Sequence, residues 1–143
     1  MERRGQADCA ITVNSNTERK DDLRRRTKAF ASLVVRFYVG LDKRREELRV
    51  LGKQLLRSGT SVAANYREGS RARSAEEFVA KAELCAQEAD ESQLWLELLR
   101  DDCGIAPSLV EPIWKEADEL IAIFVTMAKR TKENRMRNLR PET

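Results

Sequence analysis

Apolar residues recur at helical spacing in four separate stretches of the chain. The first stretch begins near Asp22 and ends at Gly40, which can take the left-handed conformation common at helix ends. The second covers about 43–68 and ends at Gly69, with Gly59 as a weak point because glycine is a poor helix former. The apolar residues behind these two predictions are Leu23, Phe30, Leu33, Val34, Phe37, Tyr38 and Leu41, then Leu48, Leu51, Leu55, Val62, Ala63 and Tyr66.

Two capping patterns predict where the third and fourth helices begin. Ser74 followed by Glu77 is a capping box, in which each side chain accepts a backbone hydrogen bond in the first helical turn. Ser108 and Glu111 repeat the pattern, and Gly104 between the two helices is a stop signal. The predicted inward stripes are Phe78, Ala82, Cys85, Ala89, Ser92, Leu96 and Leu99, then Ile113, Ala117, Leu120, Ile121, Phe124 and Met127.

Four helices with short connections predict an all-α fold, an antiparallel up-and-down four-helix bundle. With only 6 Gly and 3 Pro in 143 residues, the chain lacks the turn residues that a β-sandwich or barrel needs. We expect one domain: a flexible N-terminal arm at 1–20, the bundle at 21–134 and a basic C-terminal tail at 135–143.

Composition excludes most common kinds of active site. The chain has no His, so Ser-His-Asp and Cys-His catalysis and His-ligated metal centres lack a required residue. Its three cysteines are odd in number and lack the C-x-x-C spacing, which argues against disulfides and zinc and favours a reducing, cytoplasmic setting. No signal peptide or membrane span is recognisable. We therefore expect a protein that is not an enzyme and needs no metal or cofactor.

Charge is unevenly distributed although the net charge is only +3. Basic residues exceed acidic ones in 1–73 and in 128–143, whereas acidic residues dominate 74–127. The strongest basic feature is a ladder at i, i+4 spacing, joined by one later arginine: Arg45, Arg49, Lys53 and Arg57, with Arg67. Such a stripe is typical of phosphate contact with RNA or DNA. The alternatives are a solvated face, or pairing with acidic residues of the third helix or of a neighbouring subunit.

The third helix supplies the acidic residues that could face this ladder, namely Glu76, Glu83, Asp90, Glu97 and Asp101. Glu88 and Glu91 share a helix face, where structural hydrogen bonding is the favoured interpretation over a metal site. Candidate partners for them are Asn65, Arg67 and Glu68 across the turn. Four residues could be proposed as nucleophiles, but none has a recognisable general base nearby in the sequence: Ser58, Thr60, Ser61 and Cys85. Trp95, Trp114 and Phe78 are expected to anchor the core or an interface.

Three runs in this order carry a family resemblance: RSGTSVAANYREG at 57–69, EADESQLWLELL at 88–99 and ADELIAIFV at 117–125. Together they resemble the bacterial four-helix bundle protein family. Its members include proteins encoded in intervening sequences of large-subunit ribosomal RNA genes, and the accessory protein of diversity-generating retroelements is a relative. The chain departs from the pattern where Ala63 or Ala64 replaces a frequent Pro, so the second helix should be straighter.

The resemblance implies a ring-like homopentamer without enzymatic activity. In the retroelement relative a basic surface of the ring engages nucleic acid and the reverse transcriptase, which makes Arg45, Arg49, Lys53, Arg57 and Arg67 the candidate contacts here. The family motif also implies a structural set that holds the bundle together: Arg57, Ser61, Asn65 and Glu68, with Glu88, Glu91 and Trp95.

Two functional hypotheses follow from the sequence. The first is a non-enzymatic oligomeric scaffold that binds structured RNA or other nucleic acid through a basic surface summed over identical subunits. The second is a protein–protein adaptor ring that docks a polypeptide, such as a reverse transcriptase, with charge asymmetry serving only subunit assembly.

Overall fold

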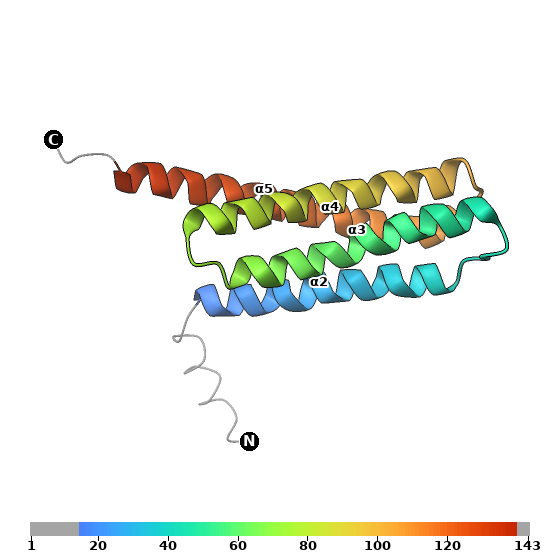
Figure 1. Ribbon diagram of the computed structural model, residues 1–143, viewed down its shortest axis with the longest axis horizontal. Coiled ribbons are helices and arrows are strands. Elements are labelled where there is room, and N and C mark those ends of the chain that lie inside the picture. Colours follow the sequence, from blue (N-terminus) through green and yellow to red (C-terminus); the bar gives the residue numbers. More distant parts are fainter. Residues whose placement is uncertain (1–14, 140–143) are drawn as a thin grey trace, which may run out of the picture.

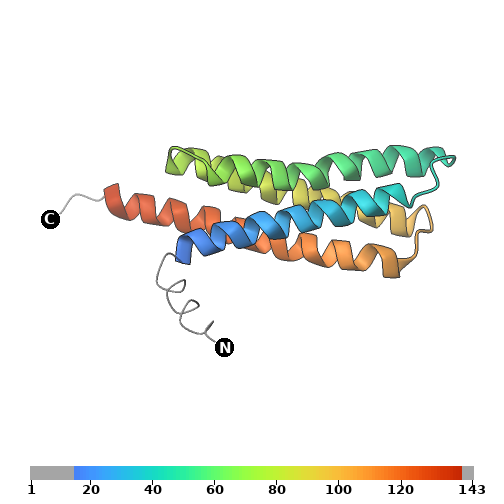
Figure 2. The ribbon, with the colours of Figure 1, turned by 90° about the horizontal axis from the view of Figure 1, so that it is seen from below.

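The computed structural model describes residues 15–139, which form four long helices packed side by side. They are α2 (Ser15–Val39), α3 (Glu46–Ser70), α4 (Ala75–Asp101) and α5 (Pro107–Leu139). Successive helices run in opposite directions, and the start of α2 and the end of α5 lie at the same end of the bundle (Figures 1 and 2). The prediction of an all-α, up-and-down four-helix fold is confirmed.

The outer two helices are longer than expected. α2 begins at Ser15 rather than near Asp22, and α5 continues to Leu139, through residues assigned to the predicted tail. Residues 1–14 and 140–143 lie outside the described residues, and with them the rest of the predicted arm and tail. Helical structure therefore extends into both highly charged ends of the sequence.

Most residues of the predicted inward stripes are buried in the core or pack against it, but Tyr38 and Ala63 do not belong to it, and Val110 and Ala128 are buried without having been predicted. In α4 the small residues Ala82, Ala89 and Ser92 are buried, which lets α3 approach closely. At this seam the buried hydroxyls of Ser58 and Ser92 share a hydrogen bond of 2.8 Å. Largest among the fully buried side chains are Phe30, Phe124, Leu48, Leu55, Leu96, Leu99 and Leu120.

The helix ends correct several expectations. Ser74 Oγ accepts a hydrogen bond from the Glu77 N–H at 3.1 Å as predicted, but the Glu77 carboxylate accepts from Arg73 N–H instead of completing the box. Ser108 does not cap α5, because the helix starts one residue earlier at Pro107, a favourable first position for proline. Ala106 precedes it and supplies the first carbonyl acceptor.

The glycines also differ from their predicted roles. Within residues 15–139, Gly104 alone has a positive φ, 74°, so Gly40 does not adopt the expected left-handed conformation. Gly69 does not end α3, which continues to Ser70. A Cβ at Gly69 would lie 2.9 Å from Lys81 Cβ, so this glycine permits close approach of α4.

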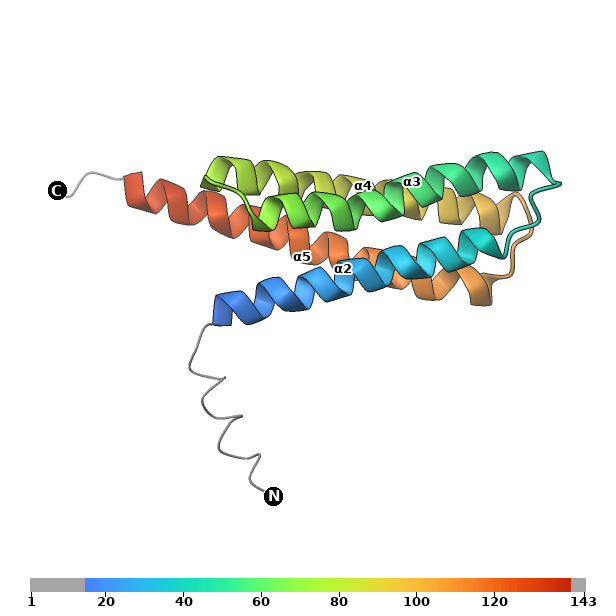
Figure 3. The same cartoon turned by 60° about the horizontal axis from the view of Figure 1, so that its bottom comes forward.

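The seam between α2 and α5 is the least extensively packed of the four helix–helix seams. Figure 3 shows α2 close to α5 at the end where α2 terminates and farther from it toward Ser15. Arg26 bridges the two helices through ion pairs with Glu116 and Glu119. Beyond Arg26, the side chains between these helices line a cavity described below.

Candidate nucleic-acid interface

The predicted basic ladder follows α3 on the side that faces α4, but most of its cations have partners within the chain. Arg45 precedes the helix, which begins at Glu46 rather than Lys43. It donates to the Glu47 carboxylate at 2.8 Å and to the Cys103 carbonyl at 3.0 Å. Arg49 forms an ion pair of 2.5 Å with Glu46, and this guanidinium lowers the pKa of the Glu46 carboxyl.

Arg57 reaches across to α4. Its guanidinium lies 2.6 Å from Glu91 Oε1 and 3.7 Å from Glu88 Oε2. Burial raises the pKa of Glu88, an effect that the Arg57 charge only partly offsets. The suggestion that Asn65, Arg67 and Glu68 would supply the partners of Glu88 and Glu91 is therefore wrong for the contacts observed.

Two of the five predicted contacts are available. Lys53 and Arg67 are exposed and form no ion pair with any side chain of residues 15–139. They are fourteen residues apart, which places Arg67 about 21 Å farther along the axis of α3 than Lys53, beyond the end of the ladder. The structure thus brings Arg45, Arg49, Lys53 and Arg57 together and separates Arg67 from them.

The acidic residues expected opposite the ladder contact other groups. Glu76 and Glu83 pair with Arg135 and Lys132 of α5. Glu97 accepts a hydrogen bond from Trp114 Nε1 at 3.0 Å. Their faces of α4 are turned toward α5, a consequence of helix rotation that the spacing along α4 alone could not reveal.

The remaining motif residues are spread along α3 and α4. Ser61 Oγ donates to the Arg57 carbonyl at 2.7 Å, next to the Arg57–Glu91 pair. Glu68 instead pairs with Lys81 at 2.5 Å, near the α3–α4 turn. Trp95 packs against the core, and its buried Nε1 has no hydrogen-bond acceptor among the described residues.

A larger concentration of positive charge lies at the end of the bundle where α2 begins and α5 ends. We call residues 15–28, 66–81 and 126–139 the basic end. They carry fifteen Lys and Arg against seven Asp and Glu, whereas residues 29–65 and 82–125 carry nine against fourteen. The separation is spatial: turns far apart in sequence meet at one end of the molecule (Figure 1).

Most cations of the basic end have no ion-pair partner in the described part of the chain. Four are paired: Arg26, Lys81, Lys132 and Arg135. The other eleven are Arg19, Lys20, Arg24, Arg25, Lys28, Arg67, Arg71, Arg73, Lys129, Arg130 and Arg137. Of these, the sequence predicts only Arg67 as a contact, although the excess of basic residues in 1–73 and 128–143 is visible in the sequence.

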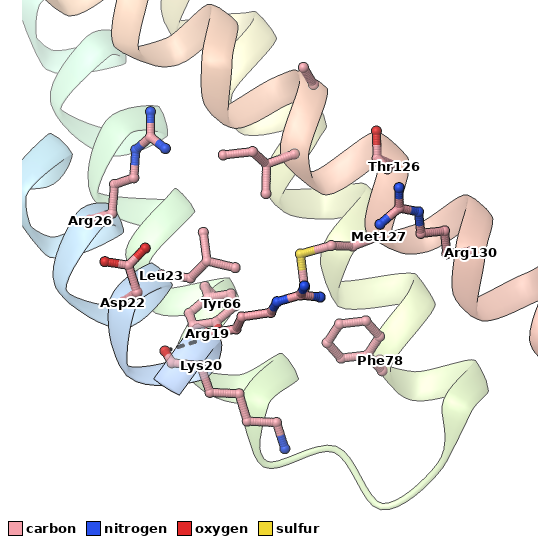
Figure 4. A pocket seen from close by; sticks show the side chains of 12 residues that line it. Arg19, Lys20, Asp22, Leu23, Arg26, Tyr66, Phe78, Thr126, Met127 and Arg130 are labelled. Atoms are coloured by element: carbon pink, nitrogen blue, oxygen red, sulfur yellow. Dashed lines mark hydrogen bonds between the residues drawn. The ribbon is translucent and has the colours of Figure 1, made fainter. Parts of the chain in front are cut away.

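A cavity of about 570 Å³ opens within the basic end, between α2 and α5. Figure 4 shows its cationic side chains, Arg19, Lys20, Arg26 and Arg130, and the Phe78 ring contributed by α4. Tyr66 closes the side formed by α3, where its hydroxyl donates to the Lys20 carbonyl at 3.2 Å. Apolar side chains and cations thus line the same cavity.

No other arrangement in residues 15–139 carries recognisable chemistry. No group of three His, Cys, Asp or Glu side chains in that range is placed to hold a metal ion. Cys85 and Cys103 are buried free thiols, while Cys9 lies outside the described residues. None of the described helices combines the length and apolarity needed to cross a membrane.

Comparison with known families identifies the chain's relatives. Residues 19–126 match the model of the 23S rRNA-intervening sequence protein family. The chain belongs to this family. A solved structure of the S23 ribosomal protein family from Bacteroides thetaiotaomicron, a protein of unknown function, is similar, with 30% sequence identity and a TM-score of 0.69. The similarity covers 77% of this chain and 97% of that one. No curated protein matches.

Proposed function

We propose that this protein is a non-enzymatic helical scaffold that binds structured RNA through its basic end. The observation that carries the proposal is the excess of eight positive charges at one end of a molecule whose net charge is +3. Lysine and arginine clusters of this kind attract the phosphate backbone and release condensed counterions on binding. The family description refers to 23S rRNA, which makes a structured RNA the first ligand to test.

The ion pairs favour the basic end over the ladder as the contact surface. Arg45, Arg49 and Arg57 already contact carboxylates of their own chain, so a phosphate would have to displace those partners. At the basic end, Arg71 and Arg73 in the α3–α4 turn are exposed and have no ion-pair partner among the described residues. Arg67 is the one originally predicted contact that lies there.

Oligomerisation would strengthen such binding. The ring-like homopentamer implied by the family resemblance would present five basic ends to one polyanion, and linked weak sites bind at high effective concentration. Exposed apolar residues on α4, Leu84 and Leu94, offer surface that self-association could cover. Light scattering measures the mass directly, and a monomer at all concentrations would contradict this part of the proposal.

Two matched charge reversals test which surface binds. The first variant combines Arg71→Glu with Arg73→Glu at the basic end, and the second combines Arg49→Glu with Lys53→Glu on the ladder. Both change the net charge by the same amount. We expect the first to weaken binding of a labelled, structured RNA by about tenfold or more and the second to change it by less than about threefold.

The RNA affinities of the two variants can be compared once light scattering shows that both keep the wild-type mass. A large loss only in the ladder variant would restore the ladder as the binding surface. If neither variant changes the affinity for RNA, neither the basic end nor the ladder is the binding surface.

The second candidate function is the adaptor ring that docks a polypeptide. The exposed Leu84 and Leu94 side chains favour it, because apolar surface binds protein more readily than RNA. If opposite charges on neighbouring subunits hold the ring together, its mass should fall as salt increases. A protein without RNA affinity and with such a salt-sensitive mass would favour the adaptor.

A further inference from the structure

The cavity between α2 and α5 combines features that an RNA scaffold could use for more than phosphate contact. It lies inside the basic end and its volume, about 570 Å³, is within the usual range for small-ligand sites. We propose that it receives a single unpaired nucleobase of the bound RNA, while the neighbouring phosphates contact Arg19, Lys20 and Arg130. This inference rests on the proposed function and names the part of an RNA that the cavity would recognise.

The interior offers a flat ring and apolar side chains. Phe78 is only partly buried, and its ring lies at the cavity opposite Arg19 (Figure 4). Tyr66 is held in place by its hydrogen bond to Lys20 and by its contact with Phe124, with ring centroids 5.8 Å apart. Tyr66 therefore belongs to the wall, and Phe78 is the ring on which a base could stack.

The cavity lining also supplies positive charges. Arg26 is occupied by Glu116 and Glu119, but Arg19, Lys20 and Arg130 form no ion pair with residues 15–139. Arg19 extends from α2 toward Met127 and Phe78 in the view of Figure 4, where its planar guanidinium could cover a stacked base.

Polar groups at the cavity favour a nucleobase over a purely apolar ligand. Asp22 and Thr126 are among the residues that line it. A carboxylate accepts hydrogen bonds from the amino groups of a base, and a hydroxyl either accepts or donates. The surrounding positive charge complements the phosphates on either side of the base.

The proposal predicts a preference between two RNAs. Bases within a duplex are stacked and paired, whereas a bulged base can be turned out and placed on an aromatic ring. We therefore compare a fully paired hairpin with the same hairpin carrying one bulged 2-aminopurine, whose fluorescence reports its stacking. The wild-type protein should bind the bulged hairpin about tenfold more tightly and change the fluorescence of the bulged base.

Filling the cavity provides the decisive variant. Ala122 lines the cavity and is exposed, so Ala122→Trp would occupy the space without altering charge. Ala29→Trp places the same ring at an exposed position of α2 that does not line the cavity. Ala122→Trp should abolish the preference for the bulge and leave binding of the paired hairpin within about twofold, and Ala29→Trp should keep the preference.

Phe78→Leu is a second cavity variant, which tests the proposal even if Ala122→Trp does not fold. This change keeps the apolar character but removes the flat ring, so it should reduce the preference while the helical circular dichroism stays at the wild-type level. Equal affinity of the wild type for the two hairpins, or a preference that survives in both cavity variants, would overturn the inference and leave phosphate binding intact. Failure to bind either hairpin would instead overturn the proposed function.

Discussion

Gly59 of α3 lies directly against Val34 of α2. A Cβ at Gly59 would be 2.7 Å from Val34 Cγ2 and 2.9 Å from Val34 Cγ1, closer than packed carbon atoms come. The glycine that weakens the intrinsic helix propensity of α3 is thus the residue that allows α2 to pack there. Its effect on the fold is the opposite of what its propensity suggests.

Gly59→Ala should therefore lower the free energy of unfolding by about 1–2 kcal/mol, because overpacking outweighs the gain in helix propensity. Gly40→Ala is the matched control, since a Cβ there would meet only backbone oxygens at 3.6 Å and 3.7 Å and its φ is not positive. Urea unfolding of both variants measures the difference. Equal stability of Gly59→Ala and the wild type would show that α2 does not pack as closely as described.

The buried Ser58–Ser92 pair predicts coupled effects. Each hydroxyl has one proton: Ser92 donates it to the Glu88 carbonyl at 2.8 Å, so Ser58, whose contact with the Leu55 carbonyl is longer at 3.3 Å, donates to Ser92 Oγ. Either single change to Ala should cost about 1 kcal/mol, and the double change should cost clearly less than the sum because both lose the same bond. Ser61→Ala, next to the exposed Arg57, serves as a control and should cost less than about 0.5 kcal/mol. Strictly additive costs for Ser58 and Ser92 would argue against the shared bond.

Alkaline pH should destabilise the fold through two buried groups. Burial raises the pKa of Cys85 to about 12 and that of Tyr66 to about 12, above their ordinary values of 9.0 and 10.0. The unfolded chain releases these protons at lower pH than the folded one, so stability falls as pH rises from about 9 toward about 12. Unfolding measured in urea between about pH 8 and about pH 10.5 tests this expectation.

Cys85→Ala separates the two contributions. Its stability at neutral pH should be lower because a buried side chain is truncated, but its decline above about pH 9 should be shallower than that of the wild type. The same slope in both proteins would remove Cys85 as a source of the alkaline effect.

The fold could be predicted because each buried stripe repeats at helical spacing. Phe30 and Val34, or Leu96 and Leu99, are three or four residues apart and all are buried. The start of α2 could not be predicted in this way, since residues 18–22 are all exposed. Likewise, the start of α5 depends on Pro107 as the first helical residue, not on the capping pattern at Ser108.

The candidate site was less predictable, for two physical reasons. The sequence leaves a solvated ladder and a paired one as alternatives, and it does not single out Glu46 and Glu47, which pair with Arg49 and Arg45 at the start of the helix. The partners of Arg57 depend on how α3 and α4 are rotated against each other, which one sequence does not specify. The basic end arises only when the chain folds and brings distant charged turns together.

The most direct test of the central claim is fluorescence anisotropy of a labelled, structured RNA titrated with the protein at low and at physiological salt. A neutral polymer serves as the control ligand. Binding through the basic end predicts saturable binding that weakens by about a hundredfold or more between about 50 and about 200 mM salt but remains measurable. No saturable binding at about 50 mM salt would contradict the account.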